Sequence, residues 1–285
     1  MNQRRTMTRR SALTLAASSA VAAVARADPA PVLKGRIKQS VARWCFGGLS
    51  LDALCDAAKG MGLVGIDLLN ETEWDTVKNH GLLCTMAYGI GSIPDGWNHL
   101  ENHDRLVAEA ERRIPLVAKA GLPNIITFSG NRHGLSDEAG LDHCVTGLKR
   151  IAALAEATKV TVCMELLNSK RDHKDYQCDH TAWGAEVCRR VGSERIKLLF
   201  DIYHMQIMEG DVCATILENK SYIGHFHTGG VPGRHEIDEA QELNYPRVCR
   251  AILESGYKGF LAHEFLPAHD PMKSLQQAVQ ICDVS

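Results

Sequence analysis

The sequence predicts a single-domain α/β protein, a (β/α)₈ barrel. Eight short apolar runs alternate with longer amphipathic stretches along the chain. Strands that are hydrophobic along their whole length and are separated by helices are typical of a parallel sheet covered on both faces. The chain has 285 residues, 45% of them hydrophobic. One such barrel needs roughly 250 residues, so the length fits a single domain.

The first four predicted strands are rich in aliphatic and aromatic residues and are bounded by Gly, Asn or Pro. They cover residues 37–46, 63–70, 82–89 and 123–130. The last four have the same composition, but acidic residues and histidines lie near their C-terminal ends. They cover residues 160–168, 196–204, 222–229 and 259–267.

The predicted helices lie between these strands and carry Gly or Lys near their C-terminal ends. The clearest cover residues 50–62, 103–121, 141–159 and 244–257. A doubly wound open sheet is the competing fold, but no G-x-G-x-x-G or P-loop follows a strand. Because barrel active sites lie at the C-terminal ends of the strands, we expect the chemistry there.

The first 27 residues predict an export signal. They combine a basic head, a mildly apolar run over residues 12–25 and an Ala-Arg-Ala cleavage site. The pair Arg9 and Arg10 before the apolar run is typical of twin-arginine signals in bacteria. We therefore expect a periplasmic protein with a signal at residues 1–27, a linker at 28–36 and a barrel at 37–285. A disordered basic tail or an uncleaved anchor is the alternative.

The charge of the mature chain argues against nucleic acid as a partner. Loss of residues 1–27 removes five arginines and no acid, so the formal charge falls from −2 to −7. Nucleic-acid binding needs a basic face, which an acidic chain does not favour. No apolar run long enough to span a membrane follows the signal. Nothing in the sequence excludes a homo-oligomer.

The ten cysteines predict buried free thiols and no disulfide framework. Several of them interrupt apolar strand or helix patterns, and none forms a CxxC pair. Export in the folded state fits this prediction, because the protein would fold in the reducing cytosol.

Four predicted strands end in residues that bind metals or transfer protons. The fifth ends with Glu165, the sixth with Asp201 and His204, the seventh with His227 and the eighth with Glu264. Each acid interrupts an apolar run, where an unpaired carboxylate would cost several kcal/mol. Something must therefore compensate these charges.

One divalent metal ion is the simplest compensation, because the acids outnumber the cations nearby in the sequence. Three carboxylates and one imidazole suit Mn²⁺, Mg²⁺ or Co²⁺ with open positions for substrate oxygens. A closed structural zinc site would prefer cysteines and more histidines. The alternative is a network of internal salt bridges across the top of the barrel.

The Gly/Pro-rich segment at residues 223–238 adds further candidates. His225 precedes His227 by two residues and shares its face of the strand, so it either supports the site or packs in the core. Arg234 would clamp a carboxylate or hydroxyls of a substrate, unless it is solvated. Glu236 would orient His235 or Arg234, and nothing in the sequence decides it.

Residues at other strand ends would complete the pocket. His204 follows Asp201 by three residues and would either contact substrate or cap the strand end. Trp44, Tyr88 and Asn131 fall on the same rim, and Trp44 is our first choice for a substrate contact. Ordinary packing of the rim is the alternative for all three.

Several motifs spread over the mature chain carry a resemblance to a known family. They are "VARWCFGG", "ITFSGNR", "MELLNS", "FDIYHMQ", "HTGGVPGRHEID" with "LNYPRV", and "HEF". Together they resemble the hydroxypyruvate isomerases of the xylose-isomerase-like barrel superfamily of sugar isomerases and epimerases. The "PGRHE" and "NYP" pieces are the most specific, whereas isolated acids at strand ends are shared across the superfamily.

The resemblance implies residue roles. One divalent metal ion would be held by Glu165, Asp201, His227 and Glu264. The two glutamates would also transfer the proton, and His204 and Arg234 would contact substrate. The chain departs from the pattern at His227, where hydroxypyruvate isomerases carry Gln and ketose epimerases carry His. The export signal is a second departure, because the metabolism associated with hydroxypyruvate is cytosolic.

The expected reaction is isomerisation of a small carbohydrate or hydroxy-keto acid, such as hydroxypyruvate to tartronate semialdehyde, through an enediolate. The metal would stabilise the negative charge that appears when the carbon-bound proton leaves. Return of the proton to the opposite face would give an epimer, so a ketose 3-epimerase is the alternative.

Two more distant functions fit the same barrel. A metal-dependent phosphodiesterase or endonuclease would need more metal-binding histidines and a basic groove. A non-catalytic periplasmic sugar-binding protein would not need both glutamates.

Overall fold

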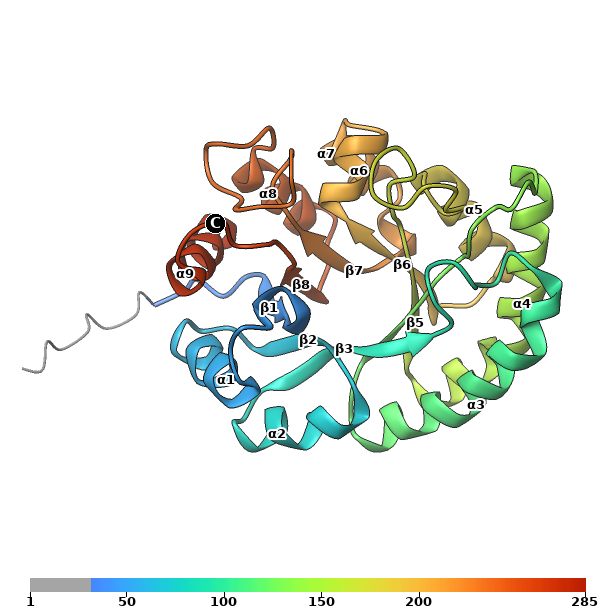
Figure 1. Ribbon diagram of the computed structural model, residues 1–285, viewed down its shortest axis with the longest axis horizontal. Helices are drawn as coiled ribbons and strands as arrows, with labels where there is room; N and C mark the ends of the chain where they lie inside the picture. The colour runs from blue at the N-terminus through green and yellow to red at the C-terminus, as the bar shows by residue number, and fades with distance from the viewer. Residues whose placement is uncertain (1–31) are drawn as a thin grey trace, which may run out of the picture.

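Eight apolar segments pair side by side in sequence order, as predicted. The computed structural model describes residues 32–285, and in it the strands form a closed barrel of parallel strands. Figure 1 shows β1 in blue beside β8 in red, where the barrel closes. The expected signal at residues 1–27 lies outside the described residues.

Seven of the strands are shorter than the apolar runs that predicted them, and β3 has the same length as its run. They are β1 (Lys38–Ala42), β2 (Gly65–Leu69), β3 (Leu83–Ile90), β4 (Asn124–Thr127), β5 (Thr161–Glu165), β6 (Ile196–Asp201), β7 (Ile223–Thr228) and β8 (Phe260–His263). Their side chains are almost entirely buried, as expected for a parallel sheet with helices outside and a packed interior.

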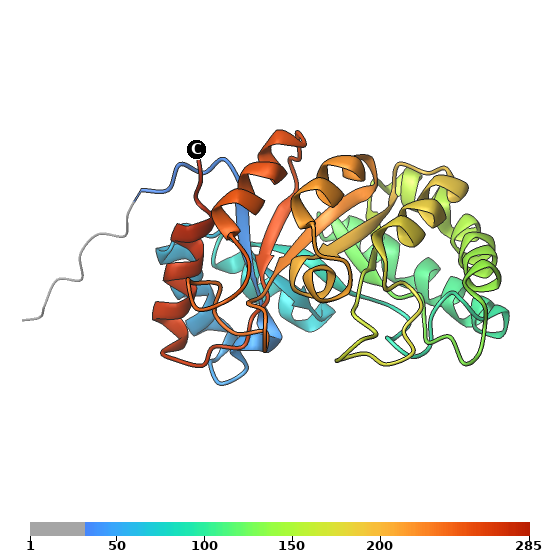
Figure 2. The same cartoon turned by 90° about the horizontal axis from the view of Figure 1, so that it is seen from above.

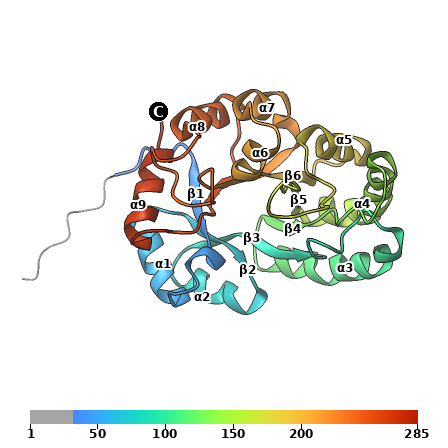
Figure 3. The ribbon, with the colours of Figure 1, turned by 45° about the horizontal axis from the view of Figure 1, so that its top comes forward.

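Eight α-helices connect the described strands, a ninth follows β8, and together they cover the outside of the barrel (Figure 3). They are α1 (Leu51–Gly60), α2 (Trp74–Asn79), α3 (His103–Lys119), α4 (Asp137–Thr158), α5 (Thr181–Val191), α6 (Ile202–Met208), α7 (Val212–Glu218), α8 (Tyr245–Glu254) and α9 (Pro271–Cys282). Short 3₁₀ helices occupy Arg43–Phe46, Glu71–Glu73, Leu100–Asn102 and Lys220–Tyr222.

Side-chain caps fix where several helices begin. Ser50 and Ser136 accept backbone N–H groups at the starts of α1 and α4, and Asp270 does the same for α9. At the C-terminal end of α5, Gly192 adopts a left-handed conformation, which glycine takes without strain.

Several predicted strands ran three or four residues too far, and for two of them the structure shows a local cause. The first ends at Ala42, after which Arg43 donates to the carbonyl of Phe46 in the 3₁₀ helix that follows. The sixth ends at Asp201, because this side chain accepts the backbone N–H of His204 and starts α6. His204 therefore lies on the first turn of a helix and not on a strand.

The loops after the strands gather at one end of the barrel, which is the lower edge in Figure 2. This end carries the C-terminal ends of all parallel strands, so side chains from β5 to β8 converge there. All ten cysteines are free and eight are buried, which confirms the prediction of unpaired thiols. Among residues 32–285, no helix has the length and hydropathy of a membrane span.

Candidate metal centre

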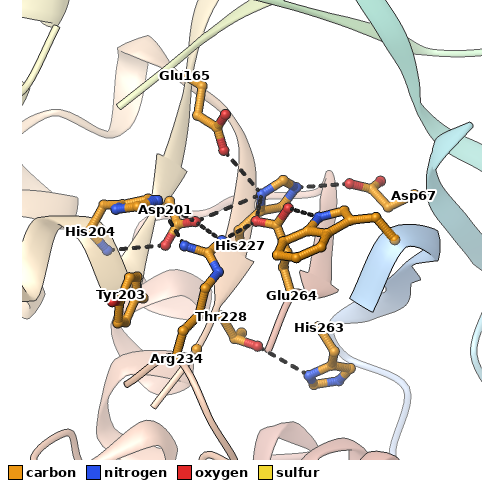
Figure 4. Close-up of polar contacts among 12 residues, drawn as sticks. Asp67, Glu165, Asp201, Tyr203, His204, His227, Thr228, Arg234, His263 and Glu264 are labelled. Atoms are coloured by element: carbon orange, nitrogen blue, oxygen red, sulfur yellow. Dashed lines mark hydrogen bonds and ion pairs between the residues drawn. The ribbon is translucent and has the colours of Figure 1, made fainter. Parts of the chain in front are cut away.

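Four ligand-type side chains meet at the C-terminal ends of neighbouring strands (Figure 4). Glu165 ends β5, Asp201 ends β6, His227 lies on β7 and Glu264 follows β8 directly. One ligand atom from each lies within 4.8 Å of the others, and all four residues are buried. We call these four residues the metal cluster. The structure thus brings together the four residues that the sequence predicts as metal ligands.

The ring of His227 faces the cluster with one nitrogen only. Its Nδ1 lies 2.6 Å from Oε2 of Glu264 and 3.4 Å from Oε1 of Glu165, at angles that make no hydrogen bond. Its Nε2 lies 2.8 Å from Oδ2 of Asp67 on the other side of the ring (Figure 4). Because a carboxylate only accepts, Nε2 carries a proton and the lone pair of Nδ1 points toward the cluster when the ring is neutral.

Asp67 is a site residue that the sequence reading missed. It is fully buried on β2 and also contacts Nε2 of His225 at 3.2 Å and the hydroxyl of Thr85. Burial alone would raise the pKa of Asp67, but His225 and His227 lower it to about 2. We call Asp67, Thr85 and His225 the inner group. The sequence does contain the feature that identifies it, because Asp67 interrupts an apolar run just as the acids of the cluster do.

Arg234 is the one Lys or Arg of the described residues that is ion-paired with the cluster. Its Nη2 lies 2.7 Å from Oδ2 of Asp201 and also contacts Oε2 of Glu264. Its Nη1 donates to Nε2 of His204 at 2.7 Å. The guanidinium lies 4.8 Å from the ring of Tyr203, as expected for a cation–π contact. Part of the alternative salt-bridge network therefore exists.

One guanidinium does not balance the acids. Burial raises the pKa of Glu165 to about 7, and repulsion from Glu264 adds to this rise although His227 opposes it. Burial would also raise the pKa of Glu264, but His227 and Arg234 hold it well below the ordinary carboxyl value. Glu165 is therefore the carboxylate whose charge is compensated least.

The donor set fits a divalent cation. Three carboxylates and a histidine nitrogen without a hydrogen bond converge on one point. Burial would lower the pKa of His227, but Glu264, Asp67 and Glu165 raise it well above its ordinary value, so the ring is charged in the metal-free site. A cation bound at Nδ1 would replace that proton, and Arg234 would then leave the three carboxylates with a net charge of −2, which one divalent ion would cancel. Oxygen-rich sites of this kind suit Mg²⁺, Mn²⁺ or Co²⁺.

A cavity of about 710 Å³ opens from the cluster toward solvent. Its polar lining comprises Ser92, Glu165, Asp172, His173, His204, Arg234 and Glu264, with Trp44, Tyr88 and Tyr203 as aromatic neighbours. Its remaining wall is largely apolar and comprises Leu68, Ile93, Pro94, Ile126, Phe128, Leu167 and Leu266. Concave sites with an apolar wall and a few convergent polar groups are typical of small-molecule binding.

The rim residues divide into two groups. Trp44 lines the cavity and its indole Nε1 donates to Oε1 of Glu264 at 2.6 Å. Tyr88 also lines the cavity. Asn131 does not: it pairs with Tyr176 in an isolated bridge between loops, so its expected place on the pocket was wrong.

The cavity also contains a residue that the sequence reading passed over. Asp172, in the loop after β5, accepts from the hydroxyl of Tyr203 at 2.8 Å and from the amide of Asn168 at 2.8 Å. No apolar run surrounds Asp172, so the criterion that selected the strand-end acids did not apply to it.

The loop that carries Arg234 is held at both ends by buried side chains. The hydroxyl of Tyr245, from the "NYP" segment, bonds the backbone N–H and carbonyl of Gly229, each at 2.8 Å. Glu236 accepts the backbone N–H groups of Ala268 and His269, at 2.9 and 3.1 Å, after β8. Glu236 therefore fixes the loop and orients no histidine or arginine side chain. Arg234 itself adopts a left-handed backbone, with a φ of 59°.

The family follows from a sequence comparison. Residues 51–282 match the model of the xylose isomerase-like TIM barrel family. The chain belongs to this family. This confirms the resemblance and, with the closed barrel, the fold class.

Curated relatives within this family are isomerases and epimerases. A 2-oxo-tetronate isomerase of Cupriavidus necator is 40% identical over 116 residues, which are 41% of this chain and 44% of that protein. The chain thus spans less than half the length of this relative. A protein named "Putative hydroxypyruvate isomerase" in Homo sapiens is 26% identical over 230 residues, 79% of this chain and 78% of that protein. These matches support an isomerase.

Solved structures agree on the fold. An AP endonuclease, family 2, from Brucella melitensis has a TM-score of 0.75 at 21% identity and covers 84% of this chain and 97% of its own. A D-psicose 3-epimerase crystallised in the presence of D-fructose has a TM-score of 0.67 at 17% identity, covering 87% and 94%. At these identities the likeness shows the barrel alone.

Proposed function

We propose that the chain is a metal-dependent isomerase of the hydroxypyruvate isomerase type, which converts a small α-hydroxycarbonyl substrate through an enediolate. The observation that carries this proposal is the pair Glu165 and Glu264. Both line the cavity, and both belong to the metal cluster. Two carboxylates beside one bound substrate suit an isomerisation, because one can move the carbon-bound proton and the other the hydroxyl proton. The names of the curated relatives point the same way.

A divalent ion, Mn²⁺, Mg²⁺ or Co²⁺, held by the cluster would stabilise negative charge on substrate oxygens as the proton leaves. The chain supplies the rest. Trp44 and Arg234 hold the two oxygens of Glu264, so this carboxylate is fixed in direction. Arg234 and His204, which share a hydrogen bond, lie where they would orient the substrate.

Glu264 is the proposed base. It would remove the proton from the carbon that bears the hydroxyl group, and the electrons of the C–H bond would form the enediolate. Return of that proton to the former carbonyl carbon, together with transfer of the hydroxyl proton to the former carbonyl oxygen, leaves a new carbonyl at the carbon that lost its proton and completes the isomerisation. Glu165, the second carboxylate, would carry the hydroxyl proton between the two oxygens.

A ketose 3-epimerase is the second candidate. If Glu165 returned a proton to the same carbon from the opposite face, the product would be an epimer. Two proteins named D-psicose 3-epimerase are among the curated relatives, and one of them, from Agrobacterium fabrum, is 31% identical over 195 residues. The pair of glutamates serves either outcome.

Proton exchange tests the proposal directly. Protein loaded with Mg²⁺ would be incubated in D₂O with hydroxypyruvate, ketoses or aldoses, and proton NMR would record loss of a carbon-bound proton signal. A parallel sample with Mn²⁺ would be quenched before measurement. We expect exchange or conversion with at least one compound and none after chelation of the metal. Exchange that persists in the chelated sample would contradict the metal requirement.

We also propose export by a twin-arginine signal. The support is the sequence of residues 1–27, in which Arg9 and Arg10 precede the apolar run. Substitution of Arg9 and Arg10 by Lys should leave the protein in the cytosol, and fractionation of cells would show it. An unchanged distribution between periplasm and cytosol would contradict this proposal.

A further inference from the structure

Strand β2 contains a residue whose backbone conformation is unusual in a strand. Leu68 has a φ of 58°, which lies in the left-handed region. Among residues 32–285, it is the one non-glycine residue of a β-strand with a positive φ. This conformation costs free energy for a side chain as large as leucine. Such strain persists where the surrounding structure requires it, and it is concentrated at functional sites.

The strained residue lies at an irregularity between β2 and β3. The pairing of the two strands shifts register on both sides of Asp67. Leu68 is then a residue of β2 without a partner in β3, and Thr85 is a residue of β3 without a partner in β2. Such β-bulges are rare between parallel strands, and they occur next to active sites, where they redirect a side chain.

The bulge turns two consecutive side chains of β2 toward the inside of the barrel. In a regular strand, consecutive side chains point to opposite faces of the sheet. Here Asp67 lies 2.8 Å from Nε2 of His227 across the interior (Figure 4), and the next residue, Leu68, lines the cavity. The irregular backbone therefore lets Asp67 reach His227 without removing the apolar wall above it.

The bulged residue of β3 supports the same arrangement. The hydroxyl of Thr85 donates to Oδ1 of Asp67, and the backbone carbonyl of Thr85 accepts the side-chain amide of Asn124 at 2.9 Å. All three residues are buried, so polar groups without these partners would be destabilising. The bulge is thus fully hydrogen-bonded at Thr85, and the strain is confined to Leu68.

We infer that Leu68 is a positioning residue. Its left-handed backbone holds the bulge that directs the carboxylate of Asp67 to Nε2 of His227, and Asp67 in turn fixes the ring whose Nδ1 faces the metal cluster. This inference rests on the proposed function only for the role of His227 as a metal ligand. The property that the site requires of Leu68 is its backbone conformation, and not its apolar side chain.

Two substitutions separate conformation from packing. Leu68→Ile keeps the size and hydrophobicity of the side chain, but a β-branched residue strongly disfavours a positive φ. Leu68→Gly removes the side chain, which is 5% exposed, and adopts this φ without strain. A positioning role predicts that Leu68→Ile damages the site more, whereas a role in packing alone predicts that Leu68→Gly does.

Two measurements on the full chain report the site without turnover. NMR of metal-free, ¹⁵N-histidine-labelled protein would record the Nε2–H of His227, assigned by its absence in His227→Gln. We expect Leu68→Gly to keep this signal at its wild-type shift, and Leu68→Ile to move it toward the shift of Asp67→Asn. In titration calorimetry, Leu68→Ile should bind Mn²⁺ roughly tenfold or more weakly, and Leu68→Gly within about threefold of wild type.

Melting temperatures test the strain even where Leu68→Ile does not fold. Leu68→Gly should melt above Leu68→Ala, because alanine still pays the cost of the left-handed backbone. Leu69 is the control, since its φ is not positive, and there glycine should melt below alanine. In an Asp67→Asn background, the difference between glycine and alanine at residue 68 should shrink, because the contact that holds the bulge is weakened.

The outcomes distinguish this inference from the proposed function. A wild-type signal of His227 and wild-type affinity for Mn²⁺ in Leu68→Ile would overturn the inference, as would larger losses in Leu68→Gly than in Leu68→Ile. Melting of Leu68→Gly below Leu68→Ala would also overturn it. A wild-type chain that shows the signal of His227 but binds no divalent ion would overturn the metal requirement of the proposed function and leave the positioning of Asp67 by Leu68 standing.

Discussion

Two groups of buried acids and histidines lie side by side in this barrel, and they differ in how their charges are compensated. In the inner group, Asp67 contacts Thr85, His225 and also His227, so its carboxylate has three partners. In the metal cluster, three carboxylates share one guanidinium and one histidine. Burial of an acid therefore does not by itself indicate a metal site. A metal site is indicated where buried carboxylates outnumber the cations and hydrogen-bond donors that pair with them.

His227 belongs to both groups through its two ring nitrogens. Nε2 faces Asp67, and Nδ1 faces Glu264 and Glu165. A carboxylate behind a histidine ligand fixes the tautomer of the ring and raises its basicity. The inner group thus positions a residue of the metal cluster. Three predictions test the division between the two groups, and a fourth extends the comparison to Asp179, a buried acid elsewhere in the molecule.

The largest effect is expected for Glu264→Gln. This change keeps the shape of the side chain but removes the proposed base, so activity should fall at least ~100-fold while the fold is retained. Exchange assays and circular dichroism would measure the two properties. Glu194→Gln is the control, because Glu194 is exposed and, within residues 32–285, its one ion pair is with Lys197. A variant that keeps more than about a tenth of the activity would exclude this role for Glu264.

The second largest effect is expected for removal of the metal, which should lower the free energy of unfolding. An ion present at about 100 times its dissociation constant stabilises the folded state by about 2.7 kcal/mol. For a domain of this size, this corresponds to a melting temperature lower by roughly 5–10 °C after chelation. Differential scanning calorimetry with and without Mn²⁺ would measure it. An identical melting temperature in both samples would contradict a metal site in this cluster.

Asp67→Asn should weaken metal binding by roughly 10–100-fold, as is typical for partners behind a histidine ligand. Titration calorimetry with Mn²⁺ would measure the affinity without any assay of turnover. Thr85→Val is the matched control, since it removes a partner of Asp67 that does not touch His227. Equal losses of affinity in the two variants would indicate that damage to the inner group, and not the contact with His227, is responsible.

The smallest effect concerns a buried acid with its own cation. Burial would raise the pKa of Asp179, but Arg132, Ser169 and His180 lower it. A lowered folded-state pKa stabilises the protein above the unfolded value of about 3.9 and loses this effect as the pH falls through the folded value. Asp179→Asn should cost about 1 kcal/mol at pH 7, measured by urea unfolding, and the difference should shrink below about pH 4.

The exposed ion pair of Asp104 and Arg150 provides the control for this last prediction. The side chain of Asp104 is 95% exposed, so Asp104→Asn should change stability little at any pH. A loss as large as that of Asp179→Asn would show that burial is not what distinguishes the two carboxylates.

Much of the fold was predictable because its signals are local. All eight strands lie within the apolar runs that predicted them, except that β3 extends one residue further, to Ile90. The errors occurred where a single polar side chain redirects the backbone, as Asp201 does when it caps α6. The start of a capped helix and the continuation of a strand can have the same hydrophobic pattern, so periodicity alone does not distinguish them.

The candidate site was predictable only in part. Glu165, Asp201, His227 and Glu264 are recognisable because an acid or histidine in an apolar run needs a partner. Asp67 meets the same criterion, yet its partners lie on β7, 158 and 160 residues away along the chain. Asp172 and Glu236 lie in polar loops, where their residue types carry no such signal.

The sequence by itself determined the barrel and the acids that it would bury, because hydrophobic periodicity and turn residues act over a few positions of the chain. Only the tertiary structure decided how those acids are compensated. Closure of the barrel brings Asp67 of β2 across the interior to His227 of β7, and the clamped loop after β7 places Arg234 between Asp201 and Glu264. These contacts depend on three-dimensional distance, which determines the electrostatic energy, and not on separation along the chain.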